Sequence, residues 1–148
     1  MISRATERRS RRRYGTIGQM SVLVHGVDIV EVDRIRAMLD EHGQRFIERC
    51  FTEAEQEYSH AAPKRQAERF AARFAAKEAV LKALGTGWRN GISWRDIGVV
   101  HVPSGQPQVV LSGRCAEIAS QLGVRQWCLS LSHTERMAMA SVVGSNAE

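Results

Sequence analysis

The first hydrophobic run of the chain predicts a strand that leads directly into a helix. β-Branched residues crowd the segment from about 21 to 30, and such a run is typical of a buried strand. Apolar residues then recur at helical spacing at Ile35, Met38 and Leu39, and Gly43 ends the predicted helix. The globular part of the chain therefore opens with a strand–helix pair.

The next two helices have clear signals at their ends. Thr52 and Glu55 stand three positions apart, as in a capping box, and Pro63 closes the stretch that they open. The longest helical pattern follows over about 65–84, where an alanine-rich sequence favours helix and allows close packing. Gly85 stops this helix.

The second half of the chain is rich in predicted strands. Residues 97–102 and 108–111 indicate two strands joined by a Pro-Ser-Gly turn, 113–122 an amphipathic helix, and 127–132 with 137–143 a terminal hairpin. No internal repeat of solenoid length is present. This order of elements predicts an α+β fold in which helices pack on an antiparallel sheet.

The positive charge of the chain is concentrated at its N-terminus. The net charge is +5, and residues 1–19 hold six arginines and one acidic residue, whereas residues 20–148 hold equal numbers of basic and acidic side chains. We therefore expect one globular domain over 20–148, preceded by a disordered arginine-rich arm. Met20 offers a second translation start, so the arm is an untranslated or unstructured leader or, as the alternative, an arm that binds nucleic acid.

Composition argues against two other classes of protein. No apolar run approaches the ~20 residues of a bilayer-spanning helix, so we expect no membrane partner. The three cysteines are widely spaced and offer neither a disulfide framework nor a zinc-binding pair; they are Cys50, Cys115 and Cys128. A cytoplasmic protein in a reducing compartment is the resulting expectation.

Asp28 is the first candidate for chemistry, because it interrupts an apolar strand. An ionised carboxylate in such a place needs a cation, which is either a lysine or arginine in a structural ion pair or a bound metal ion. Glu78 and Lys82 are a second candidate, since one helical turn of roughly 6 Å separates them and they share a face. Alternatively, Glu78 and Lys82 form a solvent-exposed ion pair that contributes little to the stability of the helix.

Three further features gain meaning beside these carboxylates. Arg73 lies on the same predicted helix and is a surface arginine or part of the site. The Gly-Thr-Gly segment at 85–87 is a helix stop or a loop near phosphate, although it lacks the Lys-Ser/Thr ending of a P-loop. Ser132 and His133 are adjacent on a strand and point to opposite faces, which disfavours a Ser–His dyad and leaves His133 to bind an anion or cap a turn.

Taken together, these residues predict a site for a hard metal ion and phosphate. One carboxylate from a strand and one from a helix suffice for Mg²⁺, because water and substrate phosphates complete its shell. Lysine and arginine beside such a site neutralise phosphate charge.

Three segments carry a resemblance to a known family. They are GVDIVEVDRI at 26–35, RFAAKEAVLKALGTG at 73–87 and SLSHTERMAMASVV at 130–143. In this order they resemble the holo-acyl-carrier-protein synthase family of 4′-phosphopantetheinyl transferases, and the resemblance spans nearly all of 20–143. It implies transfer of 4′-phosphopantetheine from coenzyme A to a serine of apo-acyl carrier protein, with release of 3′,5′-ADP, in support of fatty acid biosynthesis.

The resemblance also implies a role for each candidate residue. Asp28 and Glu78 would hold Mg²⁺ and act as catalytic residues with Lys82, which contacts phosphate oxygens. The remaining nucleotide-binding residues would be Arg73 and His133 at the phosphates, and Gly85, Thr86, Gly87, Gly105 and Pro107 in the loops around the nucleotide. Arg34 would dock the acidic carrier protein, and a homotrimer would share its active sites between neighbouring chains.

Two details and two rival functions stay open at this stage. The proton of the carrier serine passes either to a metal-bound water or to Glu78. Gln106 stands where many relatives have lysine, which leaves the adenine-side contacts undefined. The rivals are a nucleic-acid-binding module built on the arginine arm, which the neutral remainder of the chain disfavours, and a nucleotide- or carrier-binding protein without transferase activity.

Overall fold

A computed structural model describes residues 21–89 and 91–148, so the arginine-rich arm at 1–19 and Met20 lie outside the described residues. The helices are α1 (Val32–His42), α2 (Gln44–Cys50), α3 (Glu53–His60), α4 (Gln66–Leu84) and α5 (Gly113–Gln121), with short 3₁₀ turns η1 (Pro63–Arg65) and η2 (Trp94–Asp96). The strands are β1 (Val22–Glu31), β2 (Ile97–His101), β3 (Pro107–Leu111), β4 (Gln126–His133) and β5 (Met137–Ser145). Each predicted strand and helix is present, and α2 is an element that the hydrophobic pattern did not predict.

The strands form two antiparallel sheets. β5 is the central strand of a three-stranded sheet with the order β1-β5-β4, and β2 pairs with β3 in a separate hairpin. β1 and β4 are therefore the two edges of the larger sheet. The α+β class predicted from the sequence is confirmed, and the second sheet arises because a short turn pairs β2 and β3 with each other.

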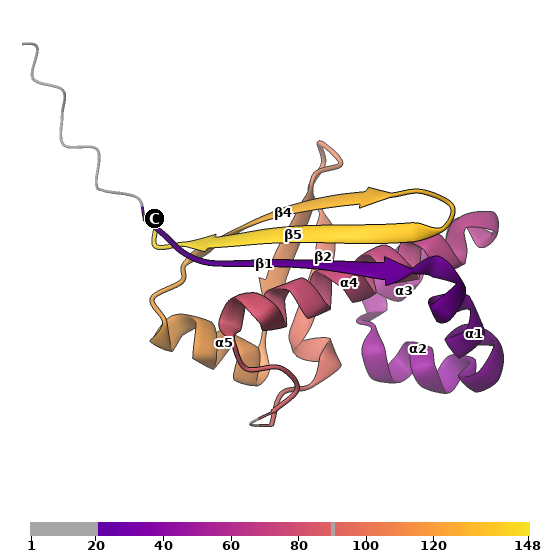
Figure 1. The fold of residues 1–148 in the computed structure, drawn as a ribbon, viewed down its shortest axis with the longest axis horizontal. Coiled ribbons are helices and arrows are strands. Elements are labelled where there is room, and N and C mark those ends of the chain that lie inside the picture. The colour runs from indigo at the N-terminus through magenta and orange to yellow at the C-terminus, as the bar shows by residue number, and fades with distance from the viewer. Residues whose placement is uncertain (1–20, 90) are drawn as a thin grey trace, which may run out of the picture.

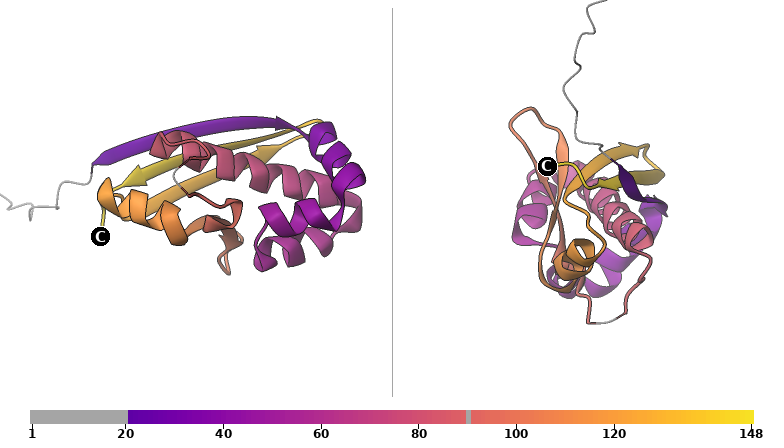
Figure 2. Two further views of the ribbon diagram at one scale, coloured as in Figure 1. Left: turned by 90° about the horizontal axis from the view of Figure 1, so that it is seen from below. Right: turned by 90° about the vertical axis from the view of Figure 1, so that its left-hand side faces the viewer.

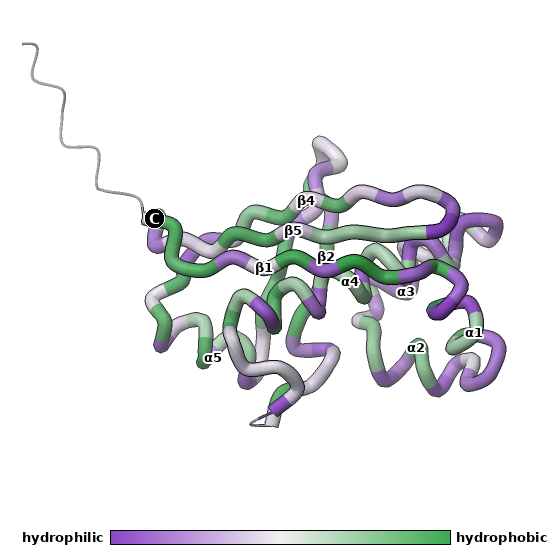
Figure 3. Tube along the Cα trace, in the orientation of Figure 1, coloured by the Kyte–Doolittle hydropathy of each residue, from purple (hydrophilic) through white to green (hydrophobic). Residues whose placement is uncertain are grey.

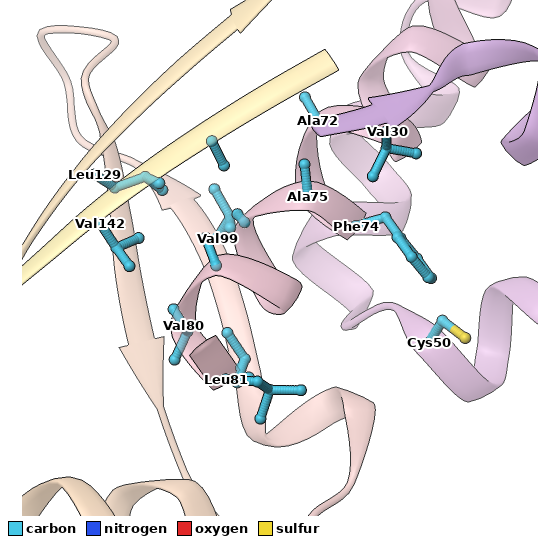
Figure 4. Packing of buried hydrophobic residues seen from close by; sticks show 14 of the residues in the cluster. Val30, Cys50, Ala72, Phe74, Ala75, Val80, Leu81, Val99, Leu129 and Val142 are labelled. Atoms are coloured by element: carbon cyan, nitrogen blue, oxygen red, sulfur yellow. The ribbon is translucent and has the colours of Figure 1, made fainter. Parts of the chain in front are cut away.

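Helix α4 forms the centre of the molecule. It lies along the three-stranded sheet, and α1, α3 and β2 pack around its other sides (Figures 1 and 2). Figure 4 shows its residues Val80 and Leu81 in one apolar cluster with Leu129, Val142 and Val99. Most residues of this helix are buried, which suits a sequence rich in alanine, because small side chains allow its neighbours to pack closely on several sides. Neither α4 nor any other described helix combines the length and hydropathy needed to cross a membrane.

β1 and α4 run in opposite directions and come into backbone contact at Gly26 (Figure 2). A Cβ atom added to Gly26 would lie 1.9 Å from the carbonyl oxygen of Ala79 and 2.9 Å from the backbone nitrogen of Ala83. No side chain fits between these backbones, so this position requires glycine. The residues that follow Gly26 on β1 consequently lie beside the preceding turns of α4.

A buried ion pair joins α3 to α4. Lys77 Nζ lies 2.9 Å from Glu55 Oε2, and both side chains are fully buried. Glu55 completes the predicted capping box by accepting a hydrogen bond from the Thr52 backbone, and it also accepts one from the Val99 backbone. Lys77 donates to the carbonyl oxygen of Trp94 at 3.1 Å. The pair therefore ties α3, α4, β2 and η2 together.

The outer face of the three-stranded sheet carries exposed apolar side chains on β1 and β5. Val27 and Ile29 on β1 are 45% and 59% exposed, and Met139 on β5, opposite Ile29, is 42% exposed. β1, which the sequence predicted as a buried strand, is thus buried on one face only, because alternate side chains point away from α4. Figure 3 shows the hydrophobic character of β1 and β5 along most of their length. Such a face is typical of an interface with another chain.

Candidate active site

Asp28 lies on β1 and faces helix α4. It follows Gly26 by two positions on the same face of the strand, and its side chain is 14% exposed. Lys82 Nζ donates to Asp28 Oδ1 at 2.9 Å and to the carbonyl oxygen of Val27 at 3.1 Å. Asp28 was expected to pair either with a basic side chain or with a metal ion, and in the structure it pairs with Lys82.

Glu78 lies one turn before Lys82 on the same face of α4. Because a strand rises ~3.3 Å per residue and a helix ~1.5 Å, the two positions from Gly26 to Asp28 correspond to about four positions of α4. Gly26 contacts α4 at Ala79 and Ala83. Because β1 and α4 run in opposite directions, Asp28 lies about one helical turn before this contact, beside the turn that carries Glu78. The structure therefore brings the strand carboxylate and the helix carboxylate to the same part of the molecule.

The two carboxylates keep donor atoms that suit a divalent cation. Glu78 Oε1 accepts a hydrogen bond from the Trp88 indole nitrogen at 3.3 Å, and Asp28 Oδ1 accepts from Lys82. Their other oxygens accept no hydrogen bond from residues 21–89 or 91–148, and no group of three or more His, Cys, Asp or Glu side chains within those ranges could hold a metal. A pair of carboxylates fits Mg²⁺ when phosphate and water supply the other ligands.

The Gly-Thr-Gly segment follows directly on α4. Gly85 adopts a φ of +73° and caps the helix, and its N–H donates to the carbonyl oxygen of Leu81 at 3.0 Å. Thr86 Oγ1 donates to the carbonyl oxygen of Gly87 at 3.1 Å. The predicted loop thus begins at the helical turn that holds Lys82.

A cleft of about 400 Å³ lies on another side of α4, against β4. Three residues predicted to bind the nucleotide line it, namely Arg73, Pro107 and His133, and Gln106 lines it beside them. Gly105 lies in the adjoining β2–β3 turn. The structure therefore gathers Arg73, His133 and the predicted adenine-side turn in one place, whereas Lys82 and the Gly-Thr-Gly segment do not line this cleft.

Arg73 is the most constrained side chain of this cleft. It is 2% exposed, yet its Nε and Nη2 atoms have no hydrogen-bond partner among the described residues. Its Nη1 donates to the carbonyl oxygen of Arg69 at 2.9 Å, and the guanidinium lies 3.9 Å from the centroid of the Tyr58 ring. Burial lowers the pKa of Arg73 from its ordinary value. A buried guanidinium with two unpaired donors suits an anion.

Aromatic and titratable side chains surround Arg73 in the cleft. His101 stacks on Tyr58 with ring centroids 4.4 Å apart, and burial, followed by the charge of Arg73, lowers the pKa of His101. His133 Nδ1 lies 3.7 Å from Glu68 Oε2. Guanidinium donors beside flat aromatic surfaces match the phosphates and the base of a nucleotide.

A larger groove, of about 760 Å³, runs beside α1 and α2. Arg34, Arg45 and Arg49 line it, and Phe74 and Trp94 add apolar surface. The Arg34 guanidinium lies 5.9 Å from the centroid of the Phe74 ring. Positive charge beside apolar contact area suits an acidic protein partner.

The structure divides the predicted site residues into two clusters. Asp28, Glu78 and Lys82 lie by the β1 edge of the sheet, whereas Arg73 and His133 lie by the β4 edge. Arg73 and Glu78 are five positions apart on α4, which turns their side chains by about 140° around the helix axis. Within one chain, the two clusters therefore face different sides of the molecule.

Some residues of these sites were missed by sequence reasoning. Tyr58, Arg69 and His101 reach the cleft from α3, α4 and β2, and Trp88 bonds to Glu78 from the loop after α4. Nothing in the sequence marks the first three as site residues, because their contacts depend on how elements distant in the sequence pack together. Trp88 had a weak one, since it directly follows the Gly-Thr-Gly segment and has a ring N–H donor.

The fold and the two clusters define a class of protein. A helix-centred α+β domain with a carboxylate and lysine site at one sheet edge and an arginine-lined cleft at the other suits a substrate that bears phosphate. Residues 25–140 match the model of the 4′-phosphopantetheinyl transferase superfamily. The holo-[acyl-carrier-protein] synthase of Koribacter versatilis is 48% identical over 122 residues, which cover 82% of this chain and 97% of that protein. This chain belongs to the 4′-phosphopantetheinyl transferase superfamily.

Solved structures share the fold. The holo-[acyl-carrier-protein] synthase of Neisseria meningitidis is similar with a TM-score of 0.76 at 35% identity, covering 84% of this chain and 98% of that chain. The enzyme of the same name from Helicobacter pylori, in complex with coenzyme A, has a TM-score of 0.71 at 30% identity and covers 81% of this chain and 98% of that one. The family and fold implied by three sequence segments are therefore confirmed.

Proposed function

We propose that this protein transfers the 4′-phosphopantetheine group of coenzyme A to a serine hydroxyl of apo-acyl carrier protein. The serine oxygen forms a bond to the β-phosphorus, the pyrophosphate bond breaks, and 3′,5′-ADP leaves. The proposal includes a cytoplasmic location and a role in fatty acid biosynthesis. It rests on family membership together with the chemistry of the two clusters.

One observation carries the proposal, namely the buried Arg73 guanidinium with two unpaired donors. Burying a charge without hydrogen-bond partners is costly, so the cleft is built for an anion that supplies them. Coenzyme A bears a 3′-phosphate and a pyrophosphate, and its adenine can stack on an aromatic ring of the cleft such as Tyr58 or His101. His133 adds a hydrogen-bond donor at the same place.

Asp28 and Glu78 are the residues that would hold Mg²⁺. When bound, Mg²⁺ supplies positive charge that stabilises the pyrophosphate and the leaving group. Lys82 is 57% exposed, so its flexible side chain can turn from Asp28 toward a phosphate oxygen. Glu78 lies on a rigid helix and can accept the serine proton if the hydroxyl approaches within hydrogen-bonding distance.

The separation of the two clusters supports a cyclic homotrimer. Its interface would use the exposed apolar face that includes Val27, Ile29 and Met139. The β1 edge of one chain would then lie near the β4 edge of the next. Each active site would take its carboxylates and lysine from one chain, and Arg73 with His133 from the neighbour.

The groove that contains Arg34 is the proposed docking surface for the carrier protein. Acyl carrier proteins are acidic partners, and the arginines of this groove would speed their encounter by electrostatic attraction. Phe74, beneath Arg34, lies one turn before Glu78 on α4. A carrier docked here would therefore lie close to the helix that carries the candidate catalytic residues.

Mass spectrometry tests the proposed transfer. Apo-acyl carrier protein incubated with this protein, coenzyme A and Mg²⁺ should gain about 340 Da, the mass of the added arm, and 3′,5′-ADP should appear. Arg73→Ala should weaken coenzyme A binding measured by calorimetry, whereas Lys64→Ala, an exposed control, should not.

The rival functions predict other results. An unmodified carrier, with coenzyme A binding retained, would identify a binding protein without transferase activity. Tight nucleic-acid binding that is sensitive to salt and lost on removal of residues 1–19 would favour the nucleic-acid-binding module.

A further inference from the structure

We infer that Trp88 is a positioning residue that orients the carboxylate of Glu78; the inference rests on the proposed function, which makes Glu78 a Mg²⁺ ligand. Trp88 Nε1 donates to Glu78 Oε1 at 3.3 Å. This bond occupies one carboxylate oxygen and restricts the direction in which the other, Oε2, can face. Hydrogen bonds from neighbouring residues orient metal-binding carboxylates in this way.

Trp88 is itself held in place by Trp94. The centroids of the two indole rings lie 3.3 Å apart. Trp94 stacks in turn on Phe74, with ring centroids 4.7 Å apart, and its carbonyl oxygen accepts a hydrogen bond from the buried Lys77. Phe74, Lys77 and Glu78 all belong to α4. The Trp88 indole therefore packs against Trp94, which contacts α4 through both Phe74 and Lys77.

The rest of the loop gives Glu78 no comparable support. A Cβ atom added to Gly85 or Gly87 would meet no atom within 4 Å, and Thr86 Oγ1 donates within the loop. Among residues 85–89, Trp88 alone makes a side-chain hydrogen bond to α4 in the described part of the chain. Phenylalanine at position 88 would keep the aromatic contact and remove the N–H donor.

The test measures Mn²⁺ binding to the full chain by electron paramagnetic resonance, with Mn²⁺ as a probe in place of Mg²⁺. Trp88→Phe should weaken Mn²⁺ binding about tenfold, as expected for loss of a residue that orients a ligand. Trp127→Phe, on β4, is the matched control and should bind Mn²⁺ as the wild type does. Both variants should unfold close to the urea concentration at which the wild type unfolds, which excludes a general loss of structure.

A double-mutant cycle with Glu78→Gln separates positioning from indirect effects. If Trp88 acts through the Glu78 carboxylate, Trp88→Phe should cause no further loss of the residual Mn²⁺ affinity in the Glu78→Gln background. A tenfold loss that persists in that background would overturn the inference. Wild-type Mn²⁺ affinity in Trp88→Phe would overturn it as well.

Failure of the proposed function gives a different pattern. If the carrier gains no mass, while Asp28→Asn abolishes Mn²⁺ binding and Trp88→Phe weakens it, the transfer proposal fails and Trp88 keeps its role. If transfer occurs and Mn²⁺ binding is independent of Trp88, the positioning inference alone fails. Mn²⁺ binding that is independent of Asp28 and Glu78 would overturn the metal assignment and this inference together.

Discussion

The backbone of Gly26 lies so close to the carbonyl group of Ala79 that β1 and α4 leave no room for a methyl group between them. A Cβ atom on Gly26 would approach that oxygen to 1.9 Å, and a backbone oxygen in the middle of a helix cannot rotate away. The register between strand and helix is fixed by this contact. The position of Asp28 beside the turn that carries Glu78 therefore depends on a glycine two residues away.

Gly26→Ala should lower the free energy of unfolding by at least the ~1–3 kcal/mol typical of overpacking, because β1 must move away from α4. Gly98→Ala is the matched control, since its added Cβ would lie 3.5 Å from Thr52 Cγ2, an ordinary van der Waals distance. Urea denaturation of both variants measures the difference. Equal stabilities of the two variants would contradict the tight contact at Gly26.

Lys77→Met should be strongly destabilising, because it leaves the Glu55 carboxylate buried without its cation. Breaking a buried pair by removing one partner costs about 3–5 kcal/mol. The double variant Glu55→Gln with Lys77→Met removes both charges and should recover part of the loss. Lys64→Met, at an exposed position, should be close to wild type in the same urea titration. A Lys77→Met protein as stable as the Lys64→Met control would show that the pair does not hold α3 to α4.

Mixed assemblies should recover activity if neighbouring chains complete each other's sites. Asp28→Asn and His133→Ala should each be inactive alone, because each damages one of the two clusters. After they are unfolded and refolded together, roughly a quarter of the shared sites in a closed ring combine an intact cluster from each side. Transfer activity of the mixture, measured by carrier mass, should therefore exceed that of either variant.

The control for this experiment mixes Asp28→Asn with Glu78→Gln. Both substitutions damage the cluster at the β1 edge, so no mixed site is intact and no activity should return. Recovery in this mixture, or its absence in the first one, would contradict sites shared between chains.

The stability of the fold should fall between neutral and mildly acidic pH in part because of His101. Burial and the charge of Arg73 lower the pKa of this imidazole in the folded protein. As the pH drops through about 6.5, the ordinary pKa of histidine, His101 binds a proton in the unfolded chain but not yet in the folded protein. Protonation therefore stabilises the unfolded state relative to the folded state. Stability is thus unaffected by His101 above that pH and decreases below it.

His101→Gln should make this decrease shallower. Thermal or urea unfolding of the variant and the wild type, measured from pH 7.5 to pH 5, gives the comparison. His25→Gln, at an exposed position on β1, serves as the control. Parallel pH profiles for wild type and His101→Gln would show that His101 is not responsible.

The sequence predicted the elements that depend on local signals. The capping box of Thr52 and Glu55, the stop at Gly85 and the apolar runs of the strands are properties of neighbouring residues, and the structure has each of them. The residue types alone suggested that Asp28 and Glu78 could share a metal ion, but only the resemblance implied that they meet, because fifty positions separate them and nothing in the spacing shows that β1 lies against α4.

Long-range packing accounts for what the sequence did not predict. Glu55 was recognised as a capping residue, but its second partner, Lys77, lies in another helix. The contact between the Trp88 and Trp94 rings and the division of the strands into two sheets likewise follow from tertiary contacts. The face of β1 that points away from α4 could not be recognised as exposed. Its residues Val27 and Ile29 suit a buried strand equally well.

Helix α4 contributes to each of the sites: Arg73 to the cleft, Phe74 to the groove, and Glu78 with Lys82 to the carboxylate cluster. Their relative directions are set by the number of residues between them. An alanine inserted between Phe74 and Glu78 would turn one end of the helix against the other by about 100° and shift it by ~1.5 Å. Evolution can therefore exchange residues in this stretch far more readily than it can insert or delete one.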